Sequence, residues 1–381
     1  MEFSWTEEQL EFKDCVLKFA EKELNNNDAQ CEKREVFPRE NWQKCADFGI
    51  QGITVPEKYG GSEQDIITAM LAMEALGYGC HDTGLPFGLS AQMWSVQYTI
   101  QKFGTEEQKQ KYLPGFCEGR LIGAQAITEP EAGSDMSNLQ TYAKKQDNGY
   151  VINGTKTMVT LAPVSNVAVV FATVDRKMGK WGITAFLVEK GTVGFQICPE
   201  LKKMGMRNIP MGDLVFEECF IPEENRLGPE GAGTSFFNSA MESERGCIFA
   251  SQLGAMERQL ERCVNYTRQR RQFGQTIGKF QSVSNRIADM KVRLETARLL
   301  LYKVGWLRKM NKNAVMEAAM AKLYFSECFV QSSMDAIRVH GGYGYMDEFE
   351  VERDLRDSVG GVLYAGTSDI QRNIIAGLLG L

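Results

Sequence analysis

The sequence contains very little histidine. Only His81 and His340 occur among 381 residues, so a histidine metal cluster and a Ser-His-Asp triad are both poorly supported. Cysteine is more frequent, with ten residues, but none forms a C-x-x-C pair, and their even spread favours reduced, mostly buried thiols. Because so few titratable side chains suit catalysis and no metal site is predicted, we expect an organic cofactor to carry any chemistry.

Long apolar runs and basic stripes are also missing. No apolar stretch approaches the ~20 residues of a membrane helix, and the N-terminal MEFSWTEEQLEFKD is acidic and amphipathic, unlike a secretory signal or an Arg-rich transit peptide. The net charge is −6, and no run of Lys and Arg alternates with aromatic residues as in nucleic-acid binding surfaces. These absences predict a cytoplasmic protein that binds neither a membrane nor nucleic acid.

What is present is a change of pattern along the chain. Apolar residues recur with helical spacing from residue 5 to about 120, and TEEQKQKYLPGF predicts a helix that begins after Thr105 and stops at Pro114. Short β-branched runs such as NVAVVFATVD and GITAFLVEKG then predict strands, and helical patterns resume after the loop NRLGPEGAG. We therefore predict an α domain over 1–122, a β domain over 123–234 and a second α domain over 235–381.

Three stretches carry residue types suited to a nucleotide cofactor. AITEPEAGSD (126–135) offers hydroxyls and free N–H groups in a tight loop. RQRRQFGQTIGKFQ (268–281) offers guanidinium groups and an aromatic ring for a pyrophosphate and an adenine. VLYAGTSDIQRNIIAG (362–377) resembles a nucleotide-binding turn that leads into a helix. Taken singly, the first stretch also fits a capping turn and the second a charged helix end.

In this order and at this spacing, the three stretches and HGGYGYMDEFEVERDLRD (340–357) resemble the acyl-CoA dehydrogenase family over essentially the whole chain. The resemblance implies a multidomain α+β fold with an N-terminal α-helical domain, a middle β-barrel-like domain and a C-terminal four-helix bundle. It also implies non-covalent FAD at the subunit interfaces of a homotetramer. The implied activity removes an α-proton from an acyl thioester and transfers a β-hydrogen to flavin N5.

The resemblance assigns a set of residues to FAD, motif by motif. Two of them depart from the family pattern, because Met158 stands where an aromatic residue usually faces the flavin and Arg338 stands in place of a Gln. The expected FAD-binding residues are Gln125, Ile127, Thr128, Ser134, Met158, Thr160, Arg270, Gln272, Phe273, Gln281, Arg338, Gly341, Gly342, Thr367 and Asp369.

The general base is the least obvious residue. The family usually carries a catalytic carboxylate where this chain has Ala365. Spacing in GTSFFNSAMESERGCIFASQLGA places Glu244 among small or apolar residues on one helix side, which fits a general base or a structural ion pair with Arg245 or a neighbouring cation. Isovaleryl-type members draw their base from this position and also show Ala-Gly-Thr, so the resemblance assigns the base to Glu244. Ala365 then keeps an oxyanion role through its backbone N–H.

A closer resemblance is to the prolyl–carrier protein dehydrogenases and oxidases of natural-product pathways, such as prodiginine and anatoxin biosynthesis. Shared passages include ITAFLVEKGTVGF and GKFQSVSNRIADMKVRLETARLLLYKVGW. This resemblance implies oxidation of an L-prolyl thioester on an acyl or peptidyl carrier protein to a dehydroprolyl or pyrroline-carboxyl thioester. Electrons would pass to oxygen or to an electron-transfer flavoprotein. The expected substrate contacts are Glu242, Arg245, Tyr364 and Gly366.

Two other functions remain compatible with the sequence. An isovaleryl-type short branched-chain acyl-CoA dehydrogenase would act on free CoA esters, and a flavin-binding scaffold would have lost its base. The basic residues Lys202, Lys203 and Arg207 either dock an acidic carrier protein or form an ordinary solvated face.

Overall fold

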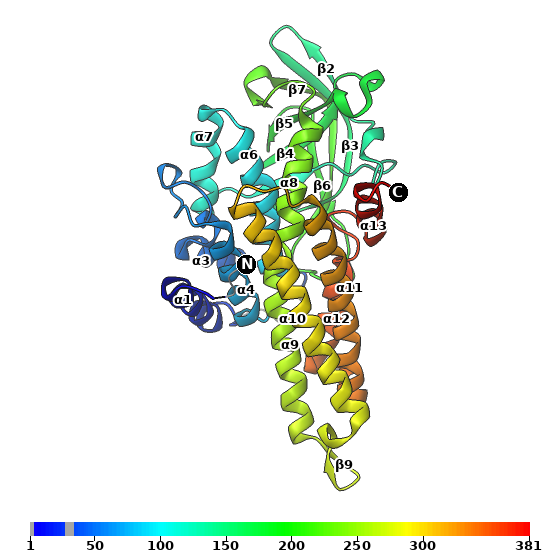
Figure 1. The fold of residues 1–381 in the computed structure, drawn as a ribbon. Helices are drawn as coiled ribbons and strands as arrows, with labels where there is room; N and C mark the ends of the chain where they lie inside the picture. Colours follow the sequence, from blue (N-terminus) through cyan, green and yellow to red (C-terminus); the bar gives the residue numbers. More distant parts are fainter. Residues whose placement is uncertain (1–3, 27–33) are drawn as a thin grey trace.

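The fold has three parts, and the computed structural model describes residues 4–26 and 34–381. Helices form both ends of the chain and a sheet forms its middle (Figure 1). Helix gives way to strand between Cys117 and Gly123, and strand gives way to helix between Leu227 and Gly233. The predicted α+β arrangement is therefore confirmed. These transitions fall within a few residues of the boundaries expected from the sequence, which we retain as proposed domain limits.

The N-terminal part consists of helices joined by short turns. α1 begins after Thr6, whose hydroxyl accepts the Gln9 N–H at 3.2 Å, and α7 begins after Thr105 with the same reciprocal cap from Gln108. These caps satisfy N–H groups that have no partner inside the helix. The helices are α1 (Glu7–Glu23), α3 (Arg39–Phe48), α4 (Ile66–Gly79), α5 (Gly84–Ala91), α6 (Tyr98–Phe103) and α7 (Glu106–Cys117).

The predicted helix stop at Pro114 is wrong. α7 continues through Pro114 to Cys117, and the Glu118 N–H donates to the Pro114 carbonyl at 3.0 Å. Proline removes one helical donor and usually ends a helix. Here Leu113 and Phe116 are fully buried in a cluster that includes residues of the sheet. Burial of this last turn outweighs the lost hydrogen bond.

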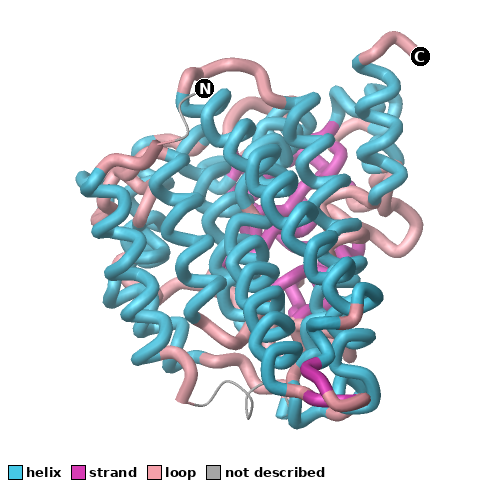
Figure 2. Tube along the Cα trace, turned by 60° about the horizontal axis from the view of Figure 1, so that its bottom comes forward, coloured by secondary structure: helices cyan, strands magenta, loops and turns pink. Residues whose placement is uncertain are grey.

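The middle part is an eight-stranded sheet in the order β6-β7-β3-β2-β4-β5-β8, with β1 paired in parallel to β4. Every residue of β4 is buried, and two hydrophobic clusters share the residues of the sheet. Most strands lie between helices in Figure 2. The strands are β1 (Gly123–Ala126), β2 (Tyr142–Gln146), β3 (Gly149–Thr160), β4 (Val167–Thr173), β5 (Ile183–Glu189), β6 (Phe195–Glu200), β7 (Met211–Pro222) and β8 (Arg226–Leu227).

The C-terminal part is a bundle of long helices. α8 and α9 follow each other across Ile248, whose backbone is itself helical. α9 packs with α10 and α11, and α12 packs against α11, in the predicted four-helix bundle (Figure 1). A hairpin of β9 and β10 caps its far end, while α13 returns to the side of the sheet (Figure 1). The elements are α8 (Gly233–Cys247), α9 (Phe249–Gln269), β9 (Arg271–Gln272), β10 (Gln275–Thr276), α10 (Gln281–Lys309), α11 (Val315–His340), α12 (Val351–Gly360) and α13 (Ser368–Leu378).

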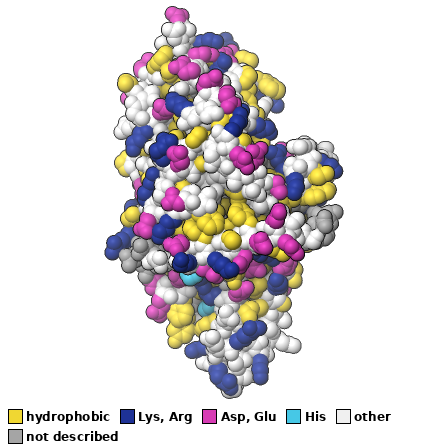
Figure 3. Space-filling model, turned by 90° about the vertical axis from the view of Figure 1, so that its left-hand side faces the viewer, with side chains coloured by type: hydrophobic (Ala, Val, Ile, Leu, Met, Phe, Trp, Pro, Cys, Tyr) yellow, Lys and Arg dark blue, Asp and Glu magenta, His cyan; other side chains and the backbone are white. Residues whose placement is uncertain are grey.

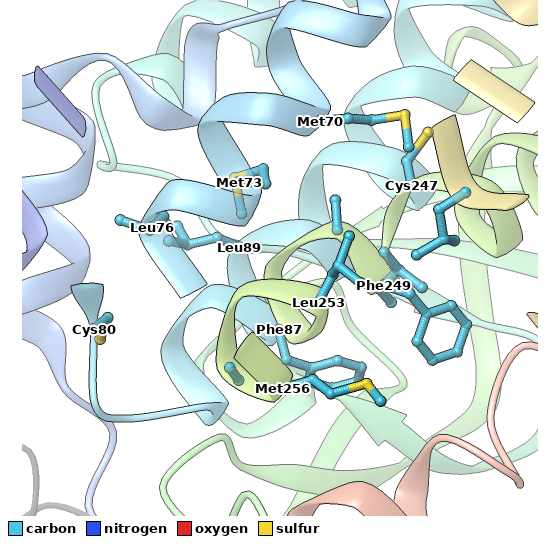
Figure 4. Packing of buried hydrophobic residues seen from close by; sticks show 14 of the residues in the cluster. Met70, Met73, Leu76, Cys80, Phe87, Leu89, Cys247, Phe249, Leu253 and Met256 are labelled. Atoms are coloured by element: carbon cyan, nitrogen blue, oxygen red, sulfur yellow. The ribbon is translucent and has the colours of Figure 1, made fainter. Parts of the chain in front are cut away.

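α4 crosses α9 at very close range, and the crossing requires glycine on both helices. A Cβ on Gly77 would lie 1.7 Å from the Ser251 carbonyl oxygen, and a Cβ on Gly254 would lie 2.0 Å from the Glu74 carbonyl oxygen. Buried side chains of α4, α5 and α9 fill the surrounding space (Figure 4). This contact fixes the N-terminal helices against the helix pair that carries Glu244.

The surface mixes both signs of charge. Acidic and basic side chains are interspersed over the face shown in Figure 3. Within the described ranges, no helix combines the length and apolar character needed to cross a membrane. Nor do three or more described His, Cys, Asp or Glu side chains gather in a way that could hold a metal ion.

Candidate active site

Glu244 lies near the C-terminal end of α8 with its carboxyl group buried. The residue is only 8% exposed, and the Ser95 hydroxyl donates to Glu244 Oε2 at 2.7 Å. Burial raises the pKa of Glu244 to about 6, although the Ser95 hydrogen bond and the Arg245 charge oppose this rise. Such a carboxylate is ionised at neutral pH yet more basic than one in water. Within the described chain the Glu244 carboxylate forms no ion pair, so the alternative of a structural ion pair lacks support.

Ser95 reaches Glu244 from a π-helical turn, Gln92–Gln97, between α5 and α6. A π turn holds one more residue than an α turn and is frequent at functional sites. The Gln92 side chain donates to Gln97 and accepts the Gly123 N–H at 2.9 Å, which ties the turn to β1. Sequence reasoning missed Ser95, and the only available signal was a group of polar residues inside an otherwise apolar helix.

Glu244 faces two adjoining cavities. The larger, of about 450 Å³, lies between the sheet, α8 and α13, and the smaller, of about 100 Å³, extends toward α5. Gln125, Met158 and Glu244 line both. Of the residues expected from the sequence, the larger cavity also contains Ile127, Thr128, Ser134, Arg245, Ala365 and Gly366, and the smaller contains Thr160 and Tyr364.

Two residues of the larger cavity have strained backbones. Met158 has φ 54° and Ala365 has φ 53°, a left-handed conformation that is uncommon for residues with a side chain. Met158 lies at a register shift between β3 and β7 and is 55% exposed. Such irregularities often redirect side chains beside active sites. The bulge thus places Met158 at the cavity wall, where the family resemblance predicts a side chain that faces the flavin.

The turn at Ala365 is held from its carbonyl side. Arg245 Nε donates to the Ala365 carbonyl at 3.0 Å and Gln371 Nε2 donates to it at 3.2 Å. Among the described residues, the Ala365 N–H has no hydrogen-bond acceptor. This leaves an oriented donor at the cavity wall, the arrangement needed to stabilise a developing oxyanion.

The larger cavity fits a flavin cofactor. Gln125 Nε2 is buried without a protein partner, and buried amides require one, which the polar edge of an isoalloxazine ring would supply. Thr128 and Ser134 place hydroxyls along the same wall. A Cβ on Gly133 would touch nothing within 4 Å. The wall therefore combines donors with open space for the chain that carries the phosphates.

A buried ion pair braces the loop that forms this wall. Lys156 Nζ lies 2.7 Å from Glu129 Oε1 and donates to the Ile127 carbonyl at 2.9 Å. Glu129 also accepts the N–H groups of Gln140 and Thr141. The two charged side chains are 0% and 2% exposed, so a buried ion pair holds the loop between β1 and β2 against β3.

A third cavity, of about 550 Å³, lies at the opposite end of α9. Arg270, Gln272, Gly341 and Gly342 line it. Because α9 has 21 residues, at ~1.5 Å per residue its ends are about 30 Å apart. The structure therefore does not bring the two predicted groups of FAD residues together within one chain.

Five expected FAD residues line none of the described cavities. Phe273 is 92% exposed, and Arg338 pairs with Asp335 at 3.2 Å. The Thr367 hydroxyl caps α13 by accepting the Ile370 N–H. The remaining two, Gln281 at the start of α10 and Asp369, which pairs with Arg372 at 3.0 Å, are both exposed.

The expectation for Glu242 needs correction. Its carboxylate pairs with Arg308 at 3.2 Å and accepts the Ala314 N–H at 2.9 Å. It lines neither cavity around Glu244, so it joins α8 to the α10–α11 turn instead of facing substrate.

The basic residues expected to dock a partner are also engaged elsewhere. Lys202 pairs with Glu35, and Lys203 donates to the Ile209 carbonyl at 2.8 Å. Arg207 Nε donates to the Met204 carbonyl at 3.3 Å. Lys203 and Arg207 thus stabilise their own loop, and Lys202 joins that loop to the N-terminal part.

The α–β–α order and a buried Glu244 carboxylate beside a cofactor-sized cavity are features of a flavin-dependent acyl-thioester dehydrogenase. Models of the acyl-CoA dehydrogenase N-terminal, middle and C-terminal domains match residues 6–120, 124–219 and 231–379. The chain belongs to the acyl-CoA dehydrogenase family.

Several relatives act on prolyl groups. The chain is 42% identical to the L-prolyl peptidyl-carrier protein dehydrogenase of Pseudomonas fluorescens over 91% of each protein. It superposes on the prolyl acyl carrier protein oxidase AnaB with TM-score 0.98 and 46% identity, covering 99% of this chain and 100% of AnaB. It superposes on PigA with FAD and proline with TM-score 0.98 and 39% identity, covering 100% of both chains.

Proposed function

We propose that this protein is an FAD-dependent oxidoreductase that oxidises an L-prolyl thioester on an acyl or peptidyl carrier protein to a dehydroprolyl or pyrroline-carboxyl thioester. The observation that carries the proposal is the buried Glu244 carboxylate, which Ser95 holds at 2.7 Å at the junction of a cofactor-sized cavity and a small one. The prolyl substrates of the similar proteins above support the choice of acyl group.

Glu244 acts as the general base and takes the α-proton of the thioester. Its burial raises its basicity, and the Ala365 N–H donates to the thioester oxygen as negative charge develops there. Arg245 positions that N–H by holding the Ala365 carbonyl. FAD, when bound, supplies the acceptor for the second hydrogen and its electron pair. Gln125, Ile127, Thr128, Ser134, Met158 and Thr160 hold its flavin end.

The smaller cavity favours a compact acyl group. Its volume is about 100 Å³, and Phe87, Ile248 and Tyr364 close it with apolar surface. The Phe87 and Tyr364 rings lie 4.9 Å apart, and Gln252 donates to the Tyr364 hydroxyl at 2.8 Å, which fixes that ring. These walls accommodate a five-membered ring and exclude a long acyl chain.

The second half of the FAD site comes from another copy of the chain. One FAD molecule does not span the about 30 Å along α9 between the two cavity groups. Arg270, Gln272, Phe273 and Gly341 of one subunit would therefore hold the pyrophosphate and adenine of a neighbouring FAD, as in a homotetramer. The other residues assigned to FAD or its surroundings on this basis are Gln281, Arg338, Gly342, Thr367 and Asp369.

The cellular setting follows from the thiols and the chemistry. Nine described cysteines are free, which fits the reducing cytoplasm. The electron acceptor is oxygen or an electron-transfer flavoprotein, and stopped-flow reoxidation of reduced enzyme in air, with and without an added flavoprotein carrier, separates them.

Mass spectrometry of the loaded carrier tests the proposal. Wild-type enzyme should remove a pair of hydrogens from prolyl-loaded carrier protein and leave isovaleryl-loaded carrier and free isovaleryl-CoA unchanged. Glu244→Gln should bind FAD, as judged by its visible spectrum, but form no product. Faster oxidation of isovaleryl-CoA would reassign the protein to the branched-chain enzymes, and full activity of Glu244→Gln would remove Glu244 as the base.

A further inference from the structure

A short loop between β4 and β5 lies at the mouth of the larger cavity. Lys180 of this loop lines the cavity together with Thr234 of α8, and the Thr234 hydroxyl donates to the Lys180 carbonyl at 2.5 Å. At the start of the loop, Asp175 accepts the Lys177 N–H at 2.8 Å. Hydrogen bonds thus hold the loop at its start and at Lys180.

Large apolar side chains project from this loop into solvent. Met178 is 52% exposed and Trp181 is 60% exposed. A tryptophan is usually buried for most of its surface, and apolar side chains that remain exposed beside a cavity commonly mark an interaction site. Met178 and Trp181 flank Gly179 and Lys180, so both expose apolar surface on the segment that reaches the cavity mouth at Lys180.

The same loop carries cations without acidic partners. Within the described chain, Arg176, Lys177 and Lys180 form no ion pair, although Arg176 donates to the Gln140 carbonyl at 2.8 Å. Arg176 lies over the Tyr142 ring at 5.7 Å, and Lys180 lies over the Trp181 ring at 5.2 Å. No carboxylate of the described chain neutralises these cations, so their charge is available to an anionic surface, in contrast to Lys202, which pairs with Glu35 of the N-terminal part.

We propose that the loop Asp175–Gly182 is the docking surface for the carrier protein that delivers the thioester. The inference rests on the proposed function. Carrier proteins are acidic, and their thioester is attached to a flexible arm that must enter the cavity. A partner seated on Met178 and Trp181 with its acidic side chains facing Arg176 and Lys177 delivers that arm beside Lys180. Apolar contacts hold the partner, and the charges speed and orient its approach.

The test compares two substrates with the same acyl group. One is prolyl-loaded carrier protein, and the other is the prolyl thioester of pantetheine, which needs no docking. Lys177→Glu and Trp181→Ala are the test variants. Lys190→Glu and Val193→Ala are matched controls from the next turn of the same domain, where Lys190 is exposed and Val193 is 87% exposed.

Each test variant should lower kcat/KM for the loaded carrier by about tenfold and leave kcat/KM for the pantetheine thioester unchanged. Added NaCl should also lower wild-type kcat/KM for the carrier only, because it screens exposed charges. Equal loss with both substrates, no loss with either, or the same loss in the controls would overturn the docking proposal. A Trp181→Ala protein that assembles with a different number of subunits would also overturn it, since the loop would then contact another copy of this chain. Wild-type enzyme that turns over neither substrate contradicts the proposed function itself, so the two failures are distinguishable.

Discussion

The Ser95 hydroxyl donates a hydrogen bond to the Glu244 carboxylate at 2.7 Å across 149 positions of the chain. Ser95 belongs to the N-terminal helices, and Glu244 belongs to α8 of the C-terminal part. The geometry of the base therefore depends on the packing between two domains, which the α4–α9 crossing fixes through Gly77 and Gly254. Ser95 positions the carboxylate and at the same time limits the rise of its pKa.

The wild-type pH profile should report Glu244 directly. Because burial raises the pKa of Glu244 to about 6 and only the ionised form accepts a proton, kcat/KM should rise with pH through that value and level off above it. The measurement is kcat/KM between pH 5 and pH 8 with the pantetheine thioester, and the protein should remain folded by circular dichroism throughout. A flat profile would exclude a carboxyl group with this pKa from the rate-limiting proton transfer.

Ser95→Ala should move that profile toward alkaline pH. The variant removes a donor that stabilises the charged form, so the apparent pKa of the rising limb should increase by about one unit. The plateau of kcat/KM should fall because the carboxylate loses its orientation. Ser95→Thr keeps a hydroxyl and is the matched control, with a profile close to wild type. A lower plateau without any pH shift would show that Ser95 contributes only to packing.

Lys156→Met should destabilise the protein and weaken cofactor retention together. The change leaves the Glu129 carboxylate buried and unpaired, which costs about 3–5 kcal/mol, and it loosens the loop that forms the wall of the larger cavity. Thermal unfolding and the ratio of FAD to protein absorbance measure the two effects. Lys145→Met removes the exposed ion pair between Lys145 of the same sheet and Glu230 and should cost little stability, because solvent screens an exposed pair. Equal effects of the two changes would contradict the bracing role.

Ala365 should tolerate glycine and resist a branched side chain. Ala365→Gly relieves the left-handed backbone strain by roughly 1 kcal/mol and keeps the N–H, so this variant should melt slightly higher with kcat within about twofold of wild type. Ala365→Val disfavours φ 53° and displaces the N–H, so kcat should fall by about tenfold or more. If both variants lost activity equally, the methyl group of Ala365 and not its N–H would be the important feature.

Arg270→Ala should release FAD even though Arg270 lies about 30 Å along α9 from Glu244. The reason is that Arg270 would complete the cofactor site of a neighbouring subunit. Co-expression of Arg270→Ala chains with Glu244→Gln chains should restore part of the activity, because a mixed assembly contains sites with both intact residues. Turnover per FAD of the purified mixture measures this recovery. Two inactive parents that give an inactive mixture would indicate that each site is built within one chain.

Local features of the fold were predictable from the sequence, and features set by packing were not. The caps at Thr6 and Thr105 follow from a few adjacent residues. The helix through Pro114 does not, because its last turn is stabilised by buried contacts with a distant sheet. The carboxylate of Glu242 was likewise misplaced, since its partner Arg308 comes from a helix that lies far along the chain.

The functional site also combines features that the sequence predicts with features that only packing determines. Spacing along α8 puts Glu244 on the inner side of the helix, and the structure buries it there. Ser95 could not be found by spacing, because the π turn at Gln92–Gln97 changes the helical register just before it meets Glu244. Arg338 remains a prediction: its motif position suggests a cofactor contact, and within the chain its exposed side chain pairs with Asp335, one turn earlier in α11.

The π turn has a consequence for how the length of this helix is constrained. A π turn accommodates one residue more than an α turn, so deletion of a single residue between Gln92 and Gln97 would restore α geometry and redirect the side chains within the turn. Ser95 and Val96, which both line the smaller cavity, would then turn away from the substrate. A one-residue change of length in this helix would therefore alter both the walls of the smaller cavity and the Ser95 hydrogen bond that positions the Glu244 carboxylate.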